Sequence, residues 1–224
     1  MSEATQIVAI DGPAGAGKSS TAKEVARRLG FAFLDTGAMY RAATWWALEQ
    51  GLDLDSPEEM AASTESMDLT IDETPRGQKV TVNGTDVTDA IRTPEVTKLI
   101  YKLDQNPEVR KHLVALQKRF GERQPTVAEG RDIGTVVFPK AKCKIYMDAA
   151  IKERARRRSK DLEKKNIPYD FAQLCADIAE RDRQSMERAD SPLRRADDAI
   201  LLDTTRLSFE ESVEEVLRIA RERL

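Results

Sequence analysis

The sequence predicts an α/β protein with three layers, in which helices cover both faces of a parallel five-stranded sheet. Two observations support this prediction. Short apolar runs alternate with longer stretches of helical periodicity, a pattern typical of parallel strands joined by crossover helices. A glycine-rich stretch at residues 12–19 also separates the first apolar run from the first helical stretch, and a helix N-terminus in that position binds anions well.

The first part of the chain contains a strand, a loop, a helix and a second strand. Residues 7–10 are a β-branched run, and the amphipathic pattern of residues 18–29 stops at Gly30. Residues 31–34 are a second buried strand, residues 35–37 are read as the turn leaving it, and residues 38–50 form a helix that ends at Gly51. This completes a βαβ unit.

The middle of the chain is more polar and reads as an insertion. Ser56 and Pro57 are an N-cap and a first-turn proline. Residues 67–71 and 78–82 follow as two strands, the second leading into the turn residues Asn83 and Gly84. We therefore expect a small β segment between helices.

The remaining elements return to the alternating pattern. Helices begin at Thr93-Pro94, Asn106-Pro107 and Ser208-Phe209, and the last three strands cover residues 126–129, 143–148 and 199–203. In a parallel sheet the carboxyl ends of the strands share one edge, where ligands bind. The motifs described below all follow such strand ends.

Composition excludes several classes of function. Lys and Arg total 36 against 39 Asp and Glu, so no overall basic field would attract nucleic acid. There is no run of about eighteen apolar residues and no cationic, apolar leader at the N-terminus. We expect a cytoplasmic protein without nucleic-acid or membrane partners. His112 is the only histidine, which argues against Ser-His-Asp and histidine–metal chemistry.

The glycine-rich stretch matches the phosphate-binding loop pattern G-x-x-x-x-G-K-S/T in full. Its residues are Gly12, Pro13, Ala14, Gly15, Ala16, Gly17, Lys18 and Ser19. In such a loop the backbone N–H groups converge on phosphate oxygens, the lysine adds charge, and the hydroxyl faces Mg²⁺. The loop predicts binding of a nucleoside triphosphate without specifying the reaction.

The surroundings of the loop favour a kinase with a small acceptor. No Asp is followed by Gly three residues later, and no Asn precedes a Lys, so the guanine-binding motifs of switch GTPases are absent. Transfer between two anionic substrates instead requires many cations. The candidates, each of which is equally well explained by a solvated surface position, are Arg41, Arg131, Arg154, Arg158, Arg181 and Arg188.

Five segments resemble the bacterial cytidylate kinases, a family of P-loop nucleoside monophosphate kinases. They read D-G-P-A-G-A-G-K-S-S, L-D-T-G-A-M-Y-R, E-G-R-D-I-G-T-V-V-F-P, E-R-D-R and S-P-L in chain order. The resemblance runs nearly end to end and includes the inserted β segment. It implies transfer of the γ-phosphoryl group of MgATP to CMP and dCMP in pyrimidine metabolism, by a monomer.

The resemblance also implies roles for individual residues. Ser20 and Arg154 would join the loop in binding ATP, and Ser19 and Asp35 would serve Mg²⁺. Cytosine would be read by Thr36, Arg110 and Asp132, since a carboxylate accepts from the exocyclic amine and a guanidinium donates to ring acceptors. The acceptor phosphate would be held by Arg41, Arg131 and Arg188, and a lid closing over ATP would carry Arg154, Arg158 and Arg181.

We expect one kinase domain over residues 1–224. Its core comprises residues 1–50, 94–150 and 190–224, the monophosphate-binding insert residues 51–93, and the lid residues 151–189. Tyr101 and Ser185 depart from the family pattern, in which a Ser and an Asp touch the ribose, so sugar recognition is expected to be built differently. Two alternatives remain open: a kinase for another acceptor such as UMP or shikimate, and a non-enzymatic protein that uses the loop as a nucleotide switch.

Overall fold

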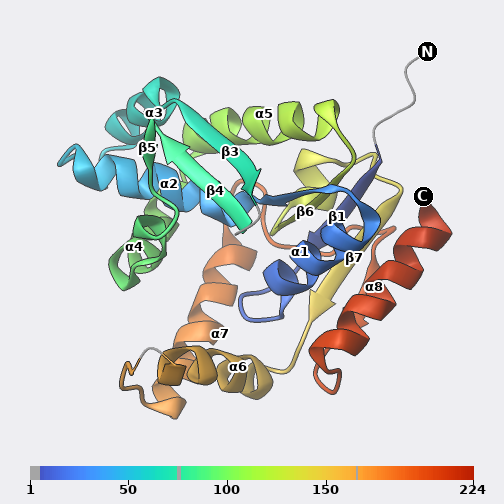
Figure 1. The fold of residues 1–224 in the computed structure, drawn as a ribbon. Coiled ribbons are helices and arrows are strands. Elements are labelled where there is room, and N and C mark those ends of the chain that lie inside the picture. The colour runs from blue at the N-terminus through green and yellow to red at the C-terminus, as the bar shows by residue number, and fades with distance from the viewer. Residues whose placement is uncertain (1–5, 75–76, 165) are drawn as a thin grey trace.

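The computed structural model describes residues 6–74, 77–164 and 166–224. Its main sheet has five parallel strands in the order β2-β6-β1-β7-β8, which confirms the predicted fold class (Figure 1). The strands of this sheet are β1 (Ile7–Asp11), β2 (Ala32–Asp35), β6 (Thr126–Gly130), β7 (Cys143–Asp148) and β8 (Ile200–Asp203). The α-helices are α1 (Lys18–Leu29), α2 (Thr36–Glu49), α3 (Pro57–Ser66), α4 (Pro94–Asp104), α5 (Pro107–Arg123), α6 (Ile151–Lys164), α7 (Phe171–Glu187) and α8 (Phe209–Arg223).

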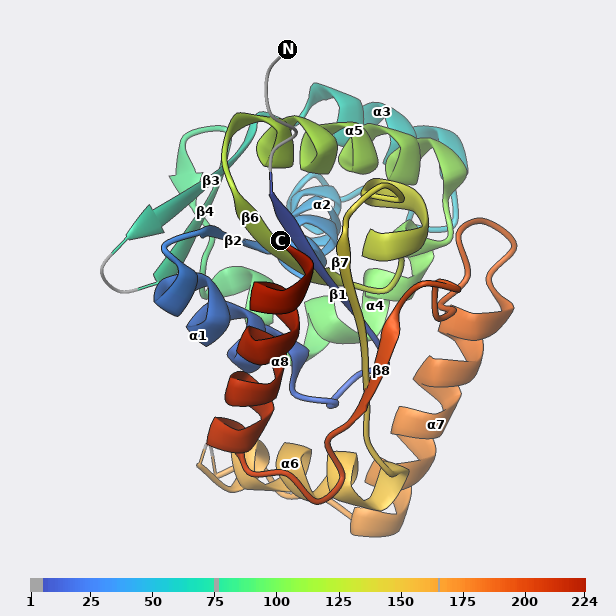
Figure 2. The same cartoon turned by 90° about the vertical axis from the view of Figure 1, so that its right-hand side faces the viewer.

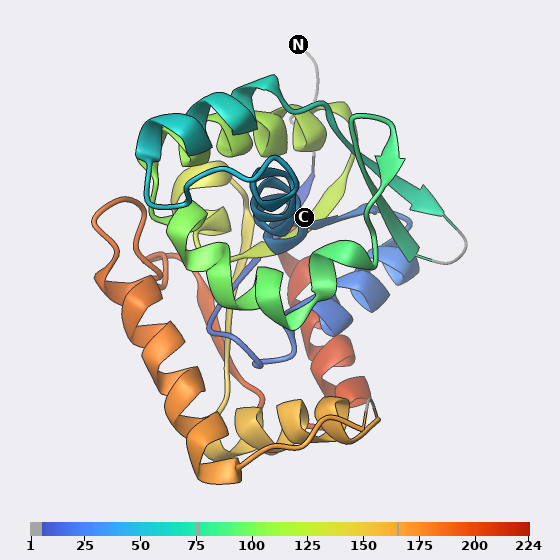
Figure 3. The ribbon, with the colours of Figure 1, turned by 90° about the vertical axis from the view of Figure 1, so that its left-hand side faces the viewer.

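Alternate side chains of the central strand β1 enter two separate apolar cores. Val8 and Ile10 pack with α1 and α8 on one face of the sheet (Figure 2). Ile7 and Ala9 pack with α2 and α5 on the other face (Figure 3). Because both faces are covered, the strands are mostly apolar, and several of them end in a carboxylate.

The predicted turn at residues 35–37 is wrong, because α2 begins at Thr36 directly after β2. The side chain of Asp35 is the reason. Its Oδ1 accepts a hydrogen bond from the backbone N–H of Ala38 at 2.8 Å, which caps the helix and removes the need for a connecting turn. Asp35 is therefore both the last residue of β2 and the N-cap of α2.

The inserted segment forms an antiparallel sheet of three strands, β3 (Leu69–Thr74), β4 (Gly77–Val82) and β5 (Thr85–Asp86). The strand β5 was not predicted. Asn83 and Gly84 both have positive φ, at 48° and 79°, as a tight hairpin turn requires. A short 3₁₀ helix, Ala90–Arg92, leads from this sheet to α4.

Two side chains of the insert satisfy the free edge of β2. Glu73 Oε1 accepts from the Phe33 N–H at 2.7 Å, and Gln78 Nε2 donates to the Phe33 carbonyl at 2.9 Å. An exposed strand edge would otherwise invite pairing with another chain. The small sheet is thus attached to the main sheet through side chains, without extending its ladder.

The helices α6 and α7 occupy most of the region expected to be helical between residues 151 and 189. They follow β7 and lie beyond the carboxyl end of the sheet (Figure 1). Across the described ranges, no helix has both the length and the apolar character needed to cross a lipid bilayer.

The closing helix α8 begins with a complete capping box. Ser208 Oγ accepts from the Glu211 N–H at 3.2 Å, and Glu211 Oε2 accepts from the Ser208 N–H at 2.8 Å. We expect Ser208→Ala to cost about 1 kcal/mol of unfolding free energy and to lower Tm by about 2–4 °C, measured by thermal denaturation. Ser208→Thr keeps an acceptor oxygen and should lose less than half as much; equal losses would contradict this role.

Candidate active site

Three glycines with positive φ shape the phosphate-binding loop between β1 and α1. The φ angles of Gly12, Gly15 and Gly17 are 146°, 78° and 94°. A Cβ atom on Gly12 would lie 1.9 Å from the carbonyl oxygen of Met147, so only glycine allows the loop to pass this close to β7. The loop is therefore fixed against the sheet at the N-terminus of α1.

Side chains of the protein bind several carbonyl groups of this loop. Lys18 Nζ donates to the Pro13 carbonyl at 2.8 Å, Arg154 to that of Ala14 at 3.0 Å, and Arg157 to that of Ala16 at 3.1 Å. Ser20 Oγ likewise donates to the Gly17 carbonyl at 3.0 Å. Because donors are bonded to these carbonyl oxygens, the oxygens repel an anion bound at the N–H groups of the loop less strongly.

Lys18 is buried at the start of α1 and is poised to meet a negative charge. Burial first, and then the charge of Arg131, lower the pKa of Lys18 to about 8. In residues 6–74, 77–164 and 166–224, Lys18 makes no ion pair. An incoming phosphate would supply the missing negative charge.

Two carboxylates and a hydroxyl lie beside the loop. Asp35 and Glu129 are register partners on β2 and β6, and Ser19 Oγ donates to Glu129 Oε1 at 2.6 Å. Burial, together with the neighbouring charge of Asp35, raises the pKa of Glu129. Glu129 was not among the predicted site residues, although its place at the end of a predicted strand could have indicated it.

The chemistry of these oxygen donors fits Mg²⁺. In the part of the chain that the structure describes, no group of three or more Asp, Glu, His or Cys side chains could enclose a metal ion. Mg²⁺ commonly binds through one or two carboxylates and completes its shell with water and substrate phosphates. Ser19, Glu129 and Asp35 match that incomplete donor set.

Arg41 projects from α2 towards Asp35. Its Nη2 lies 2.9 Å from Asp35 Oδ2, and Arg92 Nη2 lies 3.6 Å from the same oxygen. Burial opposes ionisation of Asp35, but the two guanidinium groups and the helix cap outweigh it and lower its pKa. The buried Nε of Arg41 has no hydrogen-bond partner within the described ranges, so Arg41 retains a donor for a ligand.

A fully buried ion pair lies between α5 and the end of β6. Arg110 Nη2 donates to Asp132 Oδ2, and its Nη1 donates to the Tyr40 hydroxyl at 3.1 Å. Arg110 is 2% exposed and Asp132 5% exposed. Burying two charges is costly unless further polar contacts compensate, and such a cost is typical of a site kept for binding.

Thr36 and Arg131 connect neighbouring strand ends beside this pair. Thr36 Oγ1 donates to the Glu129 carbonyl at 2.7 Å, and Arg131 Nη1 donates to the Gly12 carbonyl at 3.0 Å. Asp11, at the end of β1, accepts from the N–H groups of Ile133 and Gly134, each at 2.7 Å. These bonds join the phosphate loop to the turn that carries Asp132.

A π-helix, Ile133–Val137, continues the chain from that turn. The sequence patterns used above did not predict it. Asp11 was also missed, because its partners lie more than a hundred positions away in the chain.

Arg188 follows α7 and is buried against backbone carbonyls. Its guanidinium donates to the carbonyls of Asp190 at 2.7 Å, Asp104 at 3.3 Å and Ser191. Burial, and then the like charge of Arg110, lower the pKa of Arg188. Arg188 is therefore close enough to Arg110 for their charges to interact.

Arg154 holds the phosphate loop to the two helices beyond the sheet. It is 4% exposed, donates to the Ala149 carbonyl at 2.8 Å, and pairs with Asp182 of α7 at 2.6 Å. Together with its bond to Ala14, these contacts make Arg154 an anchor of the loop. Arg157, which was not predicted, has a similar place through Thr204 at 2.6 and 3.0 Å.

Arg158 and Arg181 differ from Arg154, since both side chains are exposed. Across the described residues neither makes an ion pair. The surrounding protein, and then the charges of Arg131 and Arg158, lower the pKa of Arg181 to about 10 although it remains open to solvent. Among the described residues no carboxylate bonds to either guanidinium group, although the charge of Asp104 acts on Arg181.

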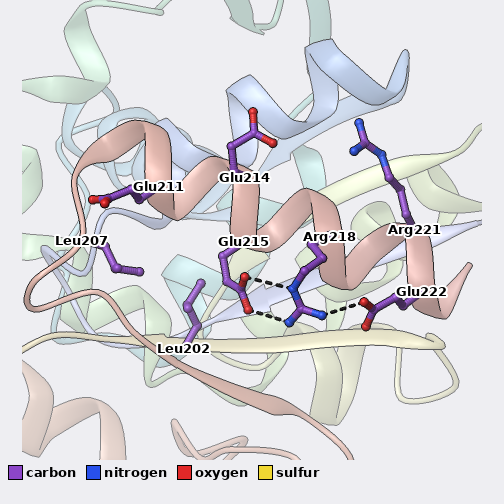
Figure 4. Close-up of a pocket in the computed structure, with 8 residues that line it drawn as sticks. All are labelled: Leu202, Leu207, Glu211, Glu214, Glu215, Arg218, Arg221 and Glu222. Atoms are coloured by element: carbon purple, nitrogen blue, oxygen red, sulfur yellow. Dashed lines mark hydrogen bonds and ion pairs between the residues drawn. The ribbon is translucent and has the colours of Figure 1, made fainter.

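A hollow of about 780 Å³ lies along α8, away from these residues (Figure 4). Leu202 and Leu207 form its floor, and Arg218 bonds to Glu215 and Glu222 at 2.6–3.0 Å. Four glutamates and two arginines line it, so its net negative charge disfavours a phosphate. The catalytic candidates are at the carboxyl edge of the sheet instead.

Known proteins resemble this chain along most of its length. The model of the family described as cytidylate kinase matches residues 8–222. A cytidylate kinase of Solibacter usitatus is 48% identical over 220 residues, covering 97% of this chain and 93% of that protein. One from Bacillus subtilis is 44% identical over 216 residues, covering 96% of each.

The chain spans 42% of the length of another relative, a bifunctional pantoate ligase/cytidylate kinase of Synechococcus elongatus, with 47% identity over 222 residues and 97% of this chain covered. A solved structure of an uncharacterized protein from Eubacterium ventriosum matches with a TM-score of 0.52 and 10% identity, covering 98% of this chain and 99% of the other. That likeness concerns the fold alone. The family model and the close relatives extend over nearly the whole chain, and the chain therefore belongs to the cytidylate kinase family.

Proposed function

We propose that the protein transfers the γ-phosphoryl group of ATP to CMP, and also to dCMP, forming ADP and CDP or dCDP. One observation carries this proposal beyond family membership. The phosphate loop after β1 and the Arg110–Asp132 pair after β6 lie at adjacent strand ends, joined by the bond from Arg131 to Gly12. A triphosphate on the loop and a base on the pair would direct their phosphates towards each other.

The base would be recognised by three side chains. Asp132 accepts from the exocyclic amine of cytosine, whereas Arg110 and the Thr36 hydroxyl serve the ring acceptors. Uracil presents a carbonyl where cytosine has its amine, so it would face the carboxylate of Asp132 without a hydrogen bond. A polar site rejects an analogue that leaves its buried groups unpaired.

The acceptor phosphate would be held by Arg41, Arg131 and Arg188. One of its oxygens attacks the γ-phosphorus as the bond from that phosphorus to the bridging oxygen of ADP breaks. The acceptor phosphate is largely a dianion near neutral pH, so no general base is needed. Lys18 and the arginines neutralise the charge that spreads over the transferring group.

The loop from Gly12 to Ser20 would bind the β- and γ-phosphates of ATP. Ser19, Glu129 and Asp35 would hold Mg²⁺ through their oxygens. When bound, Mg²⁺ neutralises phosphate charge and orients the phosphoryl group for in-line transfer. Glu129 extends the metal donors expected from the sequence.

We propose that residues 151–189 act as a lid on the core of residues 1–50, 94–150 and 190–224. Arg158 and Arg181 are the exposed cations that would close on ATP, while Arg154 anchors the lid base to the loop. Closure would exclude water and prevent hydrolysis of ATP. The insert at residues 51–93 would close on the monophosphate. All these groups come from one chain, which supports action as a monomer.

A panel of acceptors tests the proposal. ADP release is followed by a coupled assay with CMP, dCMP, UMP and shikimate, each with MgATP. We expect rapid release with CMP and dCMP, and a kcat/KM for UMP lower by at least about 10²-fold. Turnover with another acceptor alone would point to a different kinase, and ATP binding without acceptor-dependent turnover would contradict an enzymatic role.

A further inference from the structure

The carboxylate of Asp104 ends α4 beside the proposed acceptor site. The backbone carbonyl of Asp104 accepts from Arg188 Nη1 at 3.3 Å and from Arg110 Nη1 at 3.5 Å. Its Oδ2 lies 4.0 Å from Arg188 Nη1, and the side chain is 28% exposed. Both the main chain and the side chain of this residue therefore face the arginines of the acceptor site.

The position of Asp104 in its helix does not favour an acid. The C-terminus of a helix carries partial negative charge, so an aspartate there is unfavourable by itself. Burial raises the pKa of Asp104, and the nearby charges of Arg188, Arg131, Arg110 and Arg181 oppose that rise. The residue is thus surrounded by cations proposed to bind the base, the phosphate and ATP.

The carboxylate of Asp104 accepts no hydrogen bond from any residue that the structure describes. The other nearby acids are occupied, since Asp132 accepts from Arg110 and Asp190 accepts from Ser191 Oγ at 2.5 Å. The buried Nε of Arg110 lies 3.6 Å from Asp190 Oδ2 and has no hydrogen-bond partner in the described part of the chain, so a donor is also left without a hydrogen bond at this site.

The sugar of a bound nucleotide has to lie between the groups that hold its base and those that hold its phosphate. Arg110 belongs to the first set, Arg131 to the second, and both act on Asp104. We infer that Asp104 accepts a hydrogen bond from a ribose hydroxyl of the acceptor nucleotide. This inference rests on the proposed function, because it assumes that CMP occupies the site.

The two positions at which the sequence departs from the family pattern do not offer a charged acceptor. Ser185 Oγ donates to the Arg181 carbonyl at 2.8 Å within α7, and its hydroxyl oxygen is a neutral acceptor, weaker than a carboxylate. Tyr101 lies one turn before Asp104 on α4 and its side chain is exposed. A carboxylate from α4 would therefore supply sugar recognition that these two residues do not.

The test compares Asp104→Asn with the native enzyme on CMP, 2′-deoxy-CMP and 3′-deoxy-CMP. A hydrogen bond to a charged acceptor corresponds to about 10- to 100-fold in kcat/KM. We expect kcat/KM of the variant to fall by this factor with CMP. With the analogue that lacks the bound hydroxyl, kcat/KM should fall by less than about threefold. The KM for ATP and the Tm should change little.

Asp197→Asn is the matched control. It removes the same charge from an exposed carboxylate of the core, outside the insert, the lid and the proposed site, and it should leave all three kcat/KM values unchanged. The inference is overturned if Asp104→Asn lowers kcat/KM by the same factor for all three acceptors. It is also overturned if the variant raises kcat/KM, because Asp104 would then only repel the acceptor phosphate. Absence of turnover with CMP in the native enzyme would overturn the proposed function as well. Failure of the inference alone would leave turnover of CMP by the native enzyme intact, so the two failures can be told apart.

Discussion

Replacement of Lys18 by alanine is expected to lower kcat by about 10³-fold with little change in fold. Lys18 is buried at the N-terminus of α1, and its ammonium bonds to the Pro13 carbonyl. It has no ion-pair partner among the described residues, so its removal leaves no acid unpaired. The variant loses the positive charge that would follow the transferring phosphoryl group, a contact that strengthens in the transition state.

The measurement is the rate of ADP release at saturating ATP and CMP, with Tm recorded for each protein. Lys23→Ala is the matched control, since it removes the same charge from an exposed position of α1, and it should retain the native rate. A Lys18→Ala enzyme within tenfold of the native kcat would sink the proposed mechanism. A large fall in Tm would show that the lysine maintains the loop instead.

The low pKa of Lys18 has a consequence for ligand binding. Lys18 and Arg181 both have lowered pKa values because burial and neighbouring cations disfavour their charged forms. The charge of Arg131 contributes to both shifts, so an anion bound beside these cations would raise the two pKa values. The repulsion among these cations is therefore relieved by the substrate, which preorganises the site for negative charge.

The main sheet could be predicted because its signals are local. Residues 143–148 form β7 with the predicted bounds, since a buried parallel strand is a mostly apolar run, here interrupted by Lys144. The start of α2 was wrong because it depends on one side chain: Asp35 caps the helix, whereas a polar residue followed by glycine is also typical of a turn. The two-residue strand β5 is too short to give a periodic pattern.

Candidate site residues could be predicted from the sequence where they form a contiguous motif. Residues that reach the site only through the order of the strands were missed. The loop from Gly12 to Ser19 is one uninterrupted pattern. Glu129 reaches Ser19 only because β6 lies between β1 and β2, and Asp11 reaches Ile133 for the same reason. Strand order is set by packing of the whole sheet, so neither contact follows from spacing along the chain.

Substitution of Asp132 by asparagine should lower kcat/KM for CMP by about 10²-fold while changing the KM for ATP less than about twofold. Asp132 accepts from Arg110 in a buried pair, and its other oxygen is the proposed acceptor for the exocyclic amine of cytosine. An amide presents both a donor and an acceptor. In the D132N variant the amide NH₂ group would face the carbonyl of uracil favourably and the amine of cytosine poorly, so the ratio of CMP to UMP turnover should fall further than CMP turnover alone.

The asparagine variant is a sharper test than Asp132→Ala. Removing one member of a buried ion pair costs about 3–5 kcal/mol of unfolding free energy, which would mix loss of fold with loss of recognition. The amide keeps the shape and one hydrogen bond to Arg110, so kcat/KM for CMP, UMP and ATP can be compared in a folded enzyme. Asp197→Asn, at an exposed carboxylate of the core, should leave the ratio unchanged. If D132N lowers CMP and UMP turnover equally, Asp132 maintains the position of Arg110 and does not read the base; a reversed preference for UMP would instead show that this carboxylate selects cytosine.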